Sequence, residues 1–337
     1  MNTDGGLDES RLKPISIAKA YPFRDPKGSL SRSLSVVIRG FENPSQSFRP
    51  TRRVCYRMIV SQVADQYADT FLRDGFVVLP DLLTAEELEA FGHAVDAAVA
   101  YRTRHDTRPL AEKTTYEQSF QQCINLWEDH PAVRPLTFHA RIAAAAAALL
   151  GAPAVRVWHD QALYKEAGGR QTDAHQDQAY WPIEEADTVT AWIPFDGSSV
   201  ESGAMAYIPG SHRFGVRKFV NIFFGEPEDL VHSPEARGVE PVFVEVPRGG
   251  VAFHHGMTFH LAAANRSGRT RRVHTIIYFR DGCTRGSSFP HPSVDRAGIA
   301  VGEVIASDVT PIAYPRSDPE LPPTPARPAK RSPRWPK

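Results

Sequence analysis

Apolar and polar residues alternate with two different periods along this chain, and the change falls at Gly151. Before it, apolar residues recur every three to four positions, which is typical of helices that bury one face. The spacing predicts helices over residues 60–71, 84–98 and about 131–150. Gly75 and Gly151 follow as stop signals, and Thr84 with Glu87 three positions later forms a capping box.

After Gly151 the apolar runs become short and are separated by Gly- and Pro-rich turns, which predicts strands. A strand is also predicted earlier, before Pro80. The predicted strands cover residues 76–79, 154–164, 188–195, 204–208, 241–246, 250–254 and 273–279. Helices first and many short strands afterwards favour one α+β domain, in which a β-barrel or sandwich carries the site.

The two ends of the chain lack this periodicity. Residues 1–57 hold eleven Lys/Arg against five Asp/Glu, and residues 311–337 hold nine prolines among basic residues. We expect residues 1–57 to be a disordered or weakly ordered extension, with Met58 as an alternative working start. We expect residues 311–337 to be extended and without regular structure, because proline lacks the backbone donor that helices and sheets need. The working domain is therefore predicted over residues 58–310.

Composition narrows the class of protein only slightly. Lys plus Arg and Asp plus Glu both number 39 in 337 residues, so net charge does not point to a nucleic acid or an acidic membrane as partner. No apolar run approaches the length of a membrane span. The three cysteines are far apart, which favours a reducing compartment, and we expect a cytoplasmic location. A small molecule is the expected partner, and oligomeric state is left open.

His175, Asp177 and His260 are the strongest candidates for chemistry. Two imidazoles and one carboxylate form the facial triad of non-haem Fe(II) oxygenases. Random placement would give about 1.5 His-x-Asp/Glu triplets in this chain, so the triplet alone has little value. In extended backbone, however, residues i and i+2 point to the same side, so His175 and Asp177 would face one point.

The rest of the site is less certain from the residues alone. Arg271, eleven positions after His260, could supply a cation for the far carboxylate of a dicarboxylic co-substrate. His254 and His255 compete with His260 for the third ligand position, and the pattern does not separate them. Arg272 should point to the opposite face of its strand from Arg271.

Several motifs taken together resemble the phytanoyl-CoA dioxygenase family, whose members are Fe(II)- and 2-oxoglutarate-dependent oxygenases. The similarity covers about residues 60–285. The matching positions are Phe71, Gly75, Pro80 and Leu83–Leu88; His175, Asp177, Tyr180, Trp181 and Pro182; Gly203, Pro209 and His212; and His260, Asn265, Ser267 and Arg271. The match at Asn265 is what selects His260 over His254 and His255.

The resemblance implies a double-stranded β-helix (a cupin-like jelly roll) with flanking N-terminal helices. It also implies O2 and 2-oxoglutarate as co-substrates, with ascorbate in support. The implied roles are Fe(II) on His175, Asp177 and His260; a salt bridge from Arg271 to 2-oxoglutarate; further co-substrate contacts from Gln161 and Trp192, and more weakly from Lys165 and Asn125; and substrate contacts from Tyr180 and Trp181.

One position departs from the family. Many relatives carry a small hydroxyl residue two positions after the distal histidine, where this chain has Ala262. Either Ser267 or a tyrosine is expected to substitute for it, or affinity for the co-substrate is expected to be lower. Residues 214–235 match no pattern and are expected to form a lid or substrate loop.

The reaction itself leaves alternatives. Because Asp177 is present, hydroxylation is favoured over halogenation, in which relatives lack this carboxylate. Two other classes of protein stay open: a cupin-like metal-dependent isomerase or hydrolase, which would not need Arg271, and a non-catalytic barrel used for binding. The family name does not make phytanoyl-CoA the substrate, since the sequence has no clear basic patch for CoA phosphates.

Overall fold

The computed structural model describes residues 21–24, 30–33, 66–216, 230–316 and 320–326. The chain divides into two units, residues 1–50 and residues 51–337. In the first unit, β1 (Tyr21–Arg24) pairs antiparallel with β2 (Leu30–Ser33). No element was predicted there, so residues 1–57 are not wholly without regular structure.

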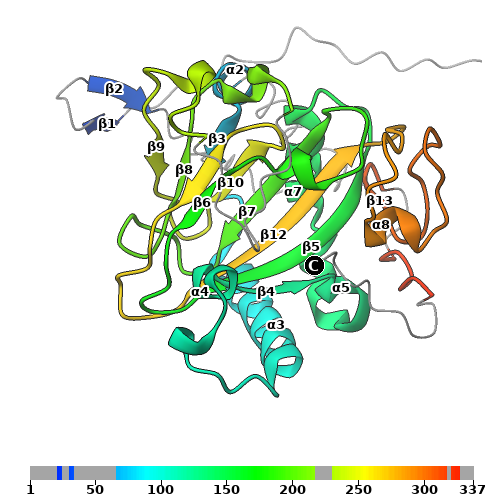
Figure 1. Cartoon of the computed structure of the whole chain (residues 1–337), viewed down its shortest axis with the longest axis horizontal. Coiled ribbons are helices and arrows are strands. Elements are labelled where there is room, and N and C mark those ends of the chain that lie inside the picture. Colours follow the sequence, from blue (N-terminus) through cyan, green and yellow to red (C-terminus); the bar gives the residue numbers. More distant parts are fainter. Residues whose placement is uncertain (1–20, 25–29, 34–65, 217–229, 317–319, 327–337) are drawn as a thin grey trace, which may run out of the picture. The chain divides into compact units, whose positions relative to one another are not determined.

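The second unit contains two antiparallel sheets (Figure 1). The larger has the order β13-β5-β12-β7-β10-β3, with β4 also paired to β5, and the smaller has the order β6-β11-β8-β9. Residues of both sheets, among them Trp192 and Val273 from the larger and Met205 and Tyr207 from the smaller, share one buried apolar cluster. The sheets therefore pack face to face, and the predicted jelly roll is confirmed.

The observed strands follow the predicted ones closely. Their bounds are β3 (Phe76–Leu79), β4 (Gln121–Ile124), β5 (Val155–Lys165), β6 (Thr172–His175), β7 (Thr188–Pro194), β8 (Met205–Tyr207), β9 (Val242–Val244), β10 (Val251–His255), β11 (His260–Ala262), β12 (Arg271–Arg280) and β13 (Ile312–Tyr314). All seven predicted strands have a counterpart, whereas β4, β6, β11 and β13 were not predicted.

The helices before Gly151 match the prediction except that the last one is divided into three. α2 (Ala68–Asp74) ends at Gly75, whose φ is 82°, and α3 (Ala85–Thr103) begins with the predicted capping box. Residues 60–65 of the first predicted helix lie outside the described residues. The helix predicted over 131–150 is divided into η3 (Pro131–Val133), α6 (Arg134–Thr137) and α7 (Ala140–Leu149). Pro135 cannot donate to the carbonyl four residues earlier, and His139 takes extended backbone between α6 and α7.

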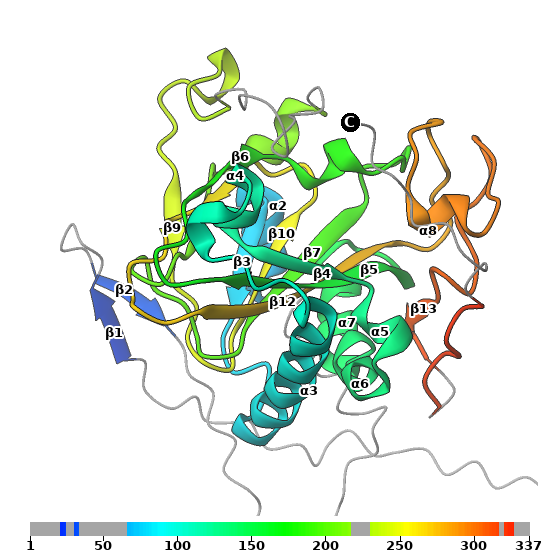
Figure 2. The same ribbon diagram turned by 60° about the horizontal axis from the view of Figure 1, so that its bottom comes forward.

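One face of the large sheet is covered by helices. α3, α7 and α5 (Leu126–Asp129) gather beside β5, β12 and β7 (Figure 2). The main apolar core lies between them, where α7 buries Ala143–Ala147 almost completely. Among the described residues, no helix is long and apolar enough to cross a membrane. The opposite face of the sheet, toward β6, β11 and β8, is left for the site.

The segment after residue 310 contributes to the domain. Ile312–Tyr314 forms β13, an edge strand paired with β5, and Val157 N donates to Pro311 O at 3.1 Å. Ala313 is buried and Leu321 packs on the main core. The prediction that residues 311–337 lack regular structure is therefore wrong for these residues. Proline is tolerated at a sheet edge, so it can flank a short strand there.

Candidate active site

His175, Asp177 and His260 meet where two short strands pair. His260 on β11 lies directly opposite His175 on β6, and Asp177 begins the 3-10 turn η4 (Asp177–Tyr180). Gln176 between them keeps extended backbone, so His175 and Asp177 face the same side as predicted. Asp177 Oδ1 lies 3.8 Å from His175 Nε2 and 3.6 Å from His260 Nε2. One ligand atom from each residue fits within 4.8 Å of the others, which suits a single metal ion.

Backbone carbonyls fix the orientation of both imidazoles. His175 Nδ1 lies 2.8 Å from Asp173 O, and His260 Nδ1 lies 2.9 Å from Thr258 O. A carbonyl can only accept, so Nδ1 carries the proton and Nε2 keeps its lone pair toward Asp177. Burial lowers the pKa of both histidines, which favours the neutral form that a metal requires.

The carboxylate of Asp177 is held through only one of its oxygens. Thr190 Oγ1 donates to Oδ2 at 2.8 Å, and His254 Nε2 lies 3.1 Å from the same oxygen. Burial alone would raise the pKa of Asp177, but the neighbouring histidines, led by His260, hold it far below its usual value. Oδ2 is thereby occupied by protein donors, and Oδ1 is directed between the two Nε2 atoms.

The three competing histidines take different places. His254 lies 3.3 Å from Tyr207 OH through Nδ1 and contacts Asp177 through Nε2, so it supports the carboxylate. His255 does not line the cavity at the site, and its ring contacts Phe71 and His212 instead. His260 is therefore the histidine that the fold brings together with His175 and Asp177.

A cavity with about 1170 Å³ of empty space, its mouth included, opens beside this cluster. All eight predicted site residues line it: His175, Asp177, His260, Arg271, Gln161, Trp192, Tyr180 and Trp181. Asn125 lines it too, whereas Lys165 lies just behind the wall, bound to the lining residue Thr172.

Two buried cations stand together at one end of the cavity. Arg271 on β12 is the direct cross-strand partner of Lys165 on β5, and both are almost fully buried. No carboxylate of the described residues forms an ion pair with either. Like charges in such a pair repel each other, and burial adds to the cost. Burial, with Arg271 nearby, lowers the pKa of Lys165 to about 6, and burial lowers that of Arg271 to about 9.

The cation pair is surrounded by polar atoms that have no partner among the described residues. These atoms are Arg271 Nε, Trp192 Nε1 and Thr275 Oγ1. The Arg271 guanidinium donates to Gly203 O, and its Cζ lies 5.2 Å from the Trp192 ring. Gly203 has φ +92°, and a Cβ there would meet Ala263 O at 2.9 Å, so this close approach needs glycine. An anionic ligand at this end would satisfy both the charge and the unused donors.

A hydroxyl group stands beside Ala262, although Ser267 does not provide it. Thr172 lies opposite Ala262 in the β6–β11 pair, lines the cavity and accepts from Lys165 Nζ at 3.3 Å. The Ser267 hydroxyl instead donates to Asn265 Oδ1 at 2.7 Å. Ser267 was therefore the wrong substitute, because it helps to close the turn before β12.

Sequence reasoning missed four further residues near the cavity, His159, Thr172, Thr190 and His291. His254 was considered only as a rival metal ligand, whereas it supports Asp177. His159 could have been found from the sequence, because residues at alternate positions of a strand share a face and Gln161 was predicted to contact the co-substrate. Thr172 and Thr190 depend on which strands pair, and His291 lies in a segment without periodicity.

The fold and site define a jelly-roll domain with a two-histidine, one-carboxylate cluster. The profile of the phytanoyl-CoA dioxygenase (PhyH) family matches residues 71–273, more than half of the chain. The chain therefore belongs to this family, which confirms the resemblance seen in the sequence.

Individual relatives are more distant. The chain is 32% identical over 128 residues to a probable alpha-ketoglutarate-dependent hypophosphite dioxygenase of Stutzerimonas stutzeri, a match that covers 37% of this chain but only 45% of that protein. It is 27% identical over 256 residues to phytanoyl-CoA dioxygenase domain-containing protein 1 of Bos taurus, covering 61% and 86% of the two chains.

Solved structures show the same architecture. The non-heme alpha ketoglutarate dependent carbocyclase SnoK from nogalamycin biosynthesis is 27% identical, with a TM-score of 0.63 over 74% of this chain and 97% of that one. EctD from S. alaskensis, solved with 2-oxoglutarate and 5-hydroxyectoine, is 22% identical, with a TM-score of 0.55 over 66% and 78%. At that identity, EctD supports the fold alone.

Proposed function

We propose that this protein is an Fe(II)- and 2-oxoglutarate-dependent dioxygenase that hydroxylates a C–H bond of a small organic molecule and releases succinate and CO2. The observation that carries the proposal is the buried Arg271, which has no carboxylate partner among the described residues and lines the same cavity as His175, Asp177 and His260. Bound iron with 2-oxoglutarate and O2 would supply the oxidation of an unactivated C–H bond.

The residues of this chain fit both groups. His175 Nε2, His260 Nε2 and Asp177 Oδ1 would hold the iron on one side and leave the other open. The planar guanidinium of Arg271 would bind the far carboxylate of 2-oxoglutarate through two parallel hydrogen bonds. Trp192, Thr275 and Gln161 border the same part of the cavity and would support the rest of the co-substrate. A cupin-like isomerase or hydrolase would have no use for the buried cations.

Hydroxylation is proposed over halogenation because Asp177 fills the position that a halide would need. Relatives named a carbocyclase and an epimerase show that this fold serves other oxidative outcomes. The test is incubation of the purified protein with Fe(II), ascorbate, 2-oxoglutarate and O2, with succinate and product masses measured. We expect iron-dependent succinate and a product that gains one oxygen atom. A chlorinated product in chloride buffer, or 2-oxoglutarate that is never consumed, would contradict the proposal.

The support of Asp177 leads to a prediction about iron affinity. Thr190→Val should weaken Fe(II) binding by about 10- to 100-fold, because Oδ2 loses a donor and the carboxylate can rotate. Thr188→Val is the matched control, since its hydroxyl donates to Gln178 Oε1, away from Asp177. Fe(II) affinity is measured anaerobically by equilibrium dialysis. Equal affinities for Thr190→Val and the wild type would show that this bond does not orient the ligand.

A further inference from the structure

Two histidines that the proposed iron and co-substrate site does not use line one part of the cavity. This part lies at the end of β5 away from Lys165. His159 on β5 lies on the same face as Gln161, and His291 immediately precedes α8 (Pro292–Asp295). Both line the cavity. Six residues of extended strand separate His159 from Lys165, about 20 Å. His159 therefore lies beyond Gln161 along β5, on the side away from Lys165.

These histidines are held rigidly in a stack of rings. The His291 ring lies 4.4 Å from that of Trp158 at 20°, and 5.7 Å from that of His159 at 21°. His291 Nδ1 accepts from Ser293 N at 3.2 Å, so its orientation is fixed. Arg285 binds Asp295 Oδ1 and the carbonyl of Ile299, which ties down the segment that carries His291. A ligand would meet an arrangement that is already organised.

Burial favours the neutral form of both imidazoles. Burial lowers the pKa of His159 to about 4, and burial with His159 and Arg285 nearby keeps the pKa of His291 well below its usual value. The His159 ring contacts Trp181 and His291 and makes no hydrogen bond to another described residue. A neutral imidazole offers one donor and one acceptor, so it suits a hydroxyl or a carbonyl group.

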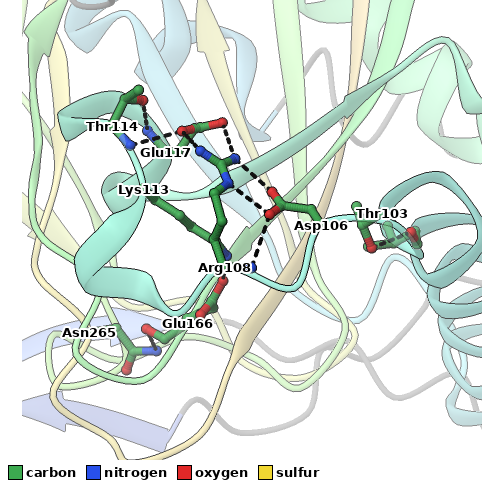
Figure 3. Close-up of polar contacts among 9 residues, drawn as sticks. Thr103, Asp106, Arg108, Lys113, Thr114, Glu117, Glu166 and Asn265 are labelled. Atoms are coloured by element: carbon green, nitrogen blue, oxygen red, sulfur yellow. Dashed lines mark hydrogen bonds and ion pairs between the residues drawn. The ribbon is translucent and has the colours of Figure 1, made fainter.

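The surrounding wall is aromatic. Tyr116 and Phe120, in and just after α4 (Thr115–Ser119), face the cavity together with Tyr180 and Trp181. Figure 3 shows how the segment that carries α4 is fastened: Arg108 bridges Asp106 and Glu117, and Lys113 pairs with Glu166. The aromatic wall is thus fixed in place, as a ring-shaped ligand would require.

Charge is scarce in the same cavity. Among the lining residues that the structure describes, Asp177 and Arg271 are the only Asp, Glu, Lys or Arg. The proposed function assigns both, one to iron and one to 2-oxoglutarate. A second carboxylate or a phosphate would then be buried without a counter-ion, which is costly.

We infer that this part of the cavity binds an uncharged, ring-containing molecule with a hydroxyl or carbonyl group, recognised by His159 and His291 between the aromatic side chains. The inference rests on the proposed oxygenase function, because it identifies the organic substrate class of that same site. The described lining residues offer no further counter-ion for a simple oxyanion or for the charged groups of an acyl-CoA thioester. His291 lies beyond residue 273, where the family match ends, so its part in recognition belongs to this chain rather than to the matched region.

Three probes with one ring system test the inference: 2-naphthol, naphthalene and 2-naphthoate. Their binding to the protein loaded with Fe(II) and 2-oxoglutarate is measured anaerobically by tryptophan fluorescence. 2-Naphthol should bind at least about five-fold more tightly than naphthalene, as one added hydrogen bond allows, and more tightly than 2-naphthoate.

His159→Phe keeps an aromatic ring at this position but removes the polar atoms. It should weaken 2-naphthol binding roughly three- to ten-fold and leave naphthalene binding within about two-fold. His291→Phe should act in the same direction.

His130→Phe is the control, since this histidine packs on Tyr101 away from the cavity. The absorption band of the Fe(II)–2-oxoglutarate complex is recorded for every variant. If the wild-type protein does not show this band, the result counts against the oxygenase proposal. With the band intact, three results would overturn the inference: 2-naphthoate or an acyl-CoA binding as tightly as 2-naphthol, no 2-naphthol binding at millimolar concentration, or an equal loss in His130→Phe.

Discussion

Replacing His260 with alanine is expected to reduce succinate formation below detection and to weaken Fe(II) binding by more than about 100-fold. Changes in groups that only orient a ligand already cost about 10- to 100-fold in metal affinity, so the loss of a ligand itself should cost more. The Nε2 atom of His260 lies 3.6 Å from Asp177 Oδ1, and its Nδ1 is bound to Thr258 O. Alanine removes the only proposed ligand supplied by β11.

The matched control is His255→Ala, because sequence spacing alone made His255 an equal candidate. Its ring is partly exposed, lies beside Phe71 and His212, and does not line the cavity. His255→Ala should therefore retain Fe(II) affinity within about two-fold, with both proteins compared by dialysis and by thermal melting. The ligand assignment fails if His260→Ala still binds iron while His255→Ala does not.

The local sequence pattern correctly predicted that two of the three proposed metal ligands, His175 and Asp177, face the same side. His175 and Asp177 are separated by one extended residue, and an extended residue directs its two neighbours to the same side whatever the rest of the fold does. Pattern could not select His260, because β11 is only three residues long and three histidines lie within seven positions of one another. The resemblance selected it through Asn265. In the structure, Asn265 Nδ2 donates to the carbonyls of Lys165 and Arg269, so it joins the end of β5 to the turn before β12.

Features that depend on contacts between segments far apart in the chain could not be predicted from the sequence. Lys165 and Arg271 become neighbours only because β5 pairs with β12 in a particular register. Thr172 stands beside Ala262 for the same reason, through β6 and β11. The strand Ile312–Tyr314 exists because β5 offers an edge, and the flanking prolines concealed it. In each case the deciding interaction is a backbone ladder to a strand far away in sequence, which no local period records.

Arg271→Ala is expected to raise the apparent KM for 2-oxoglutarate by roughly 30- to 1000-fold. A charge-assisted bidentate contact in a mostly dry site contributes about 2–4 kcal/mol, and the alanine variant would leave the far carboxylate buried beside Lys165 alone. The KM of Arg271→Lys should lie between those of the wild type and Arg271→Ala, because lysine keeps the charge but lacks the planar guanidinium. Initial rates of succinate formation across a range of 2-oxoglutarate concentrations give KM and kcat for each protein.

Arg272→Ala tests whether position, rather than loss of any arginine, causes the effect. Arg272 lies one residue along β12 and points to the opposite face, where it pairs with Asp96 and Asp196 at 2.6 and 2.7 Å. These pairs are partly exposed, so their loss should cost about 1 kcal/mol of stability or less and leave the KM for 2-oxoglutarate within about two-fold. If both alanine variants raised KM equally, the buried cation would not be the group that binds the co-substrate. A rise confined to Arg271→Ala would assign that carboxylate to the end of the cavity where β5 and β12 bring Arg271 and Lys165 together.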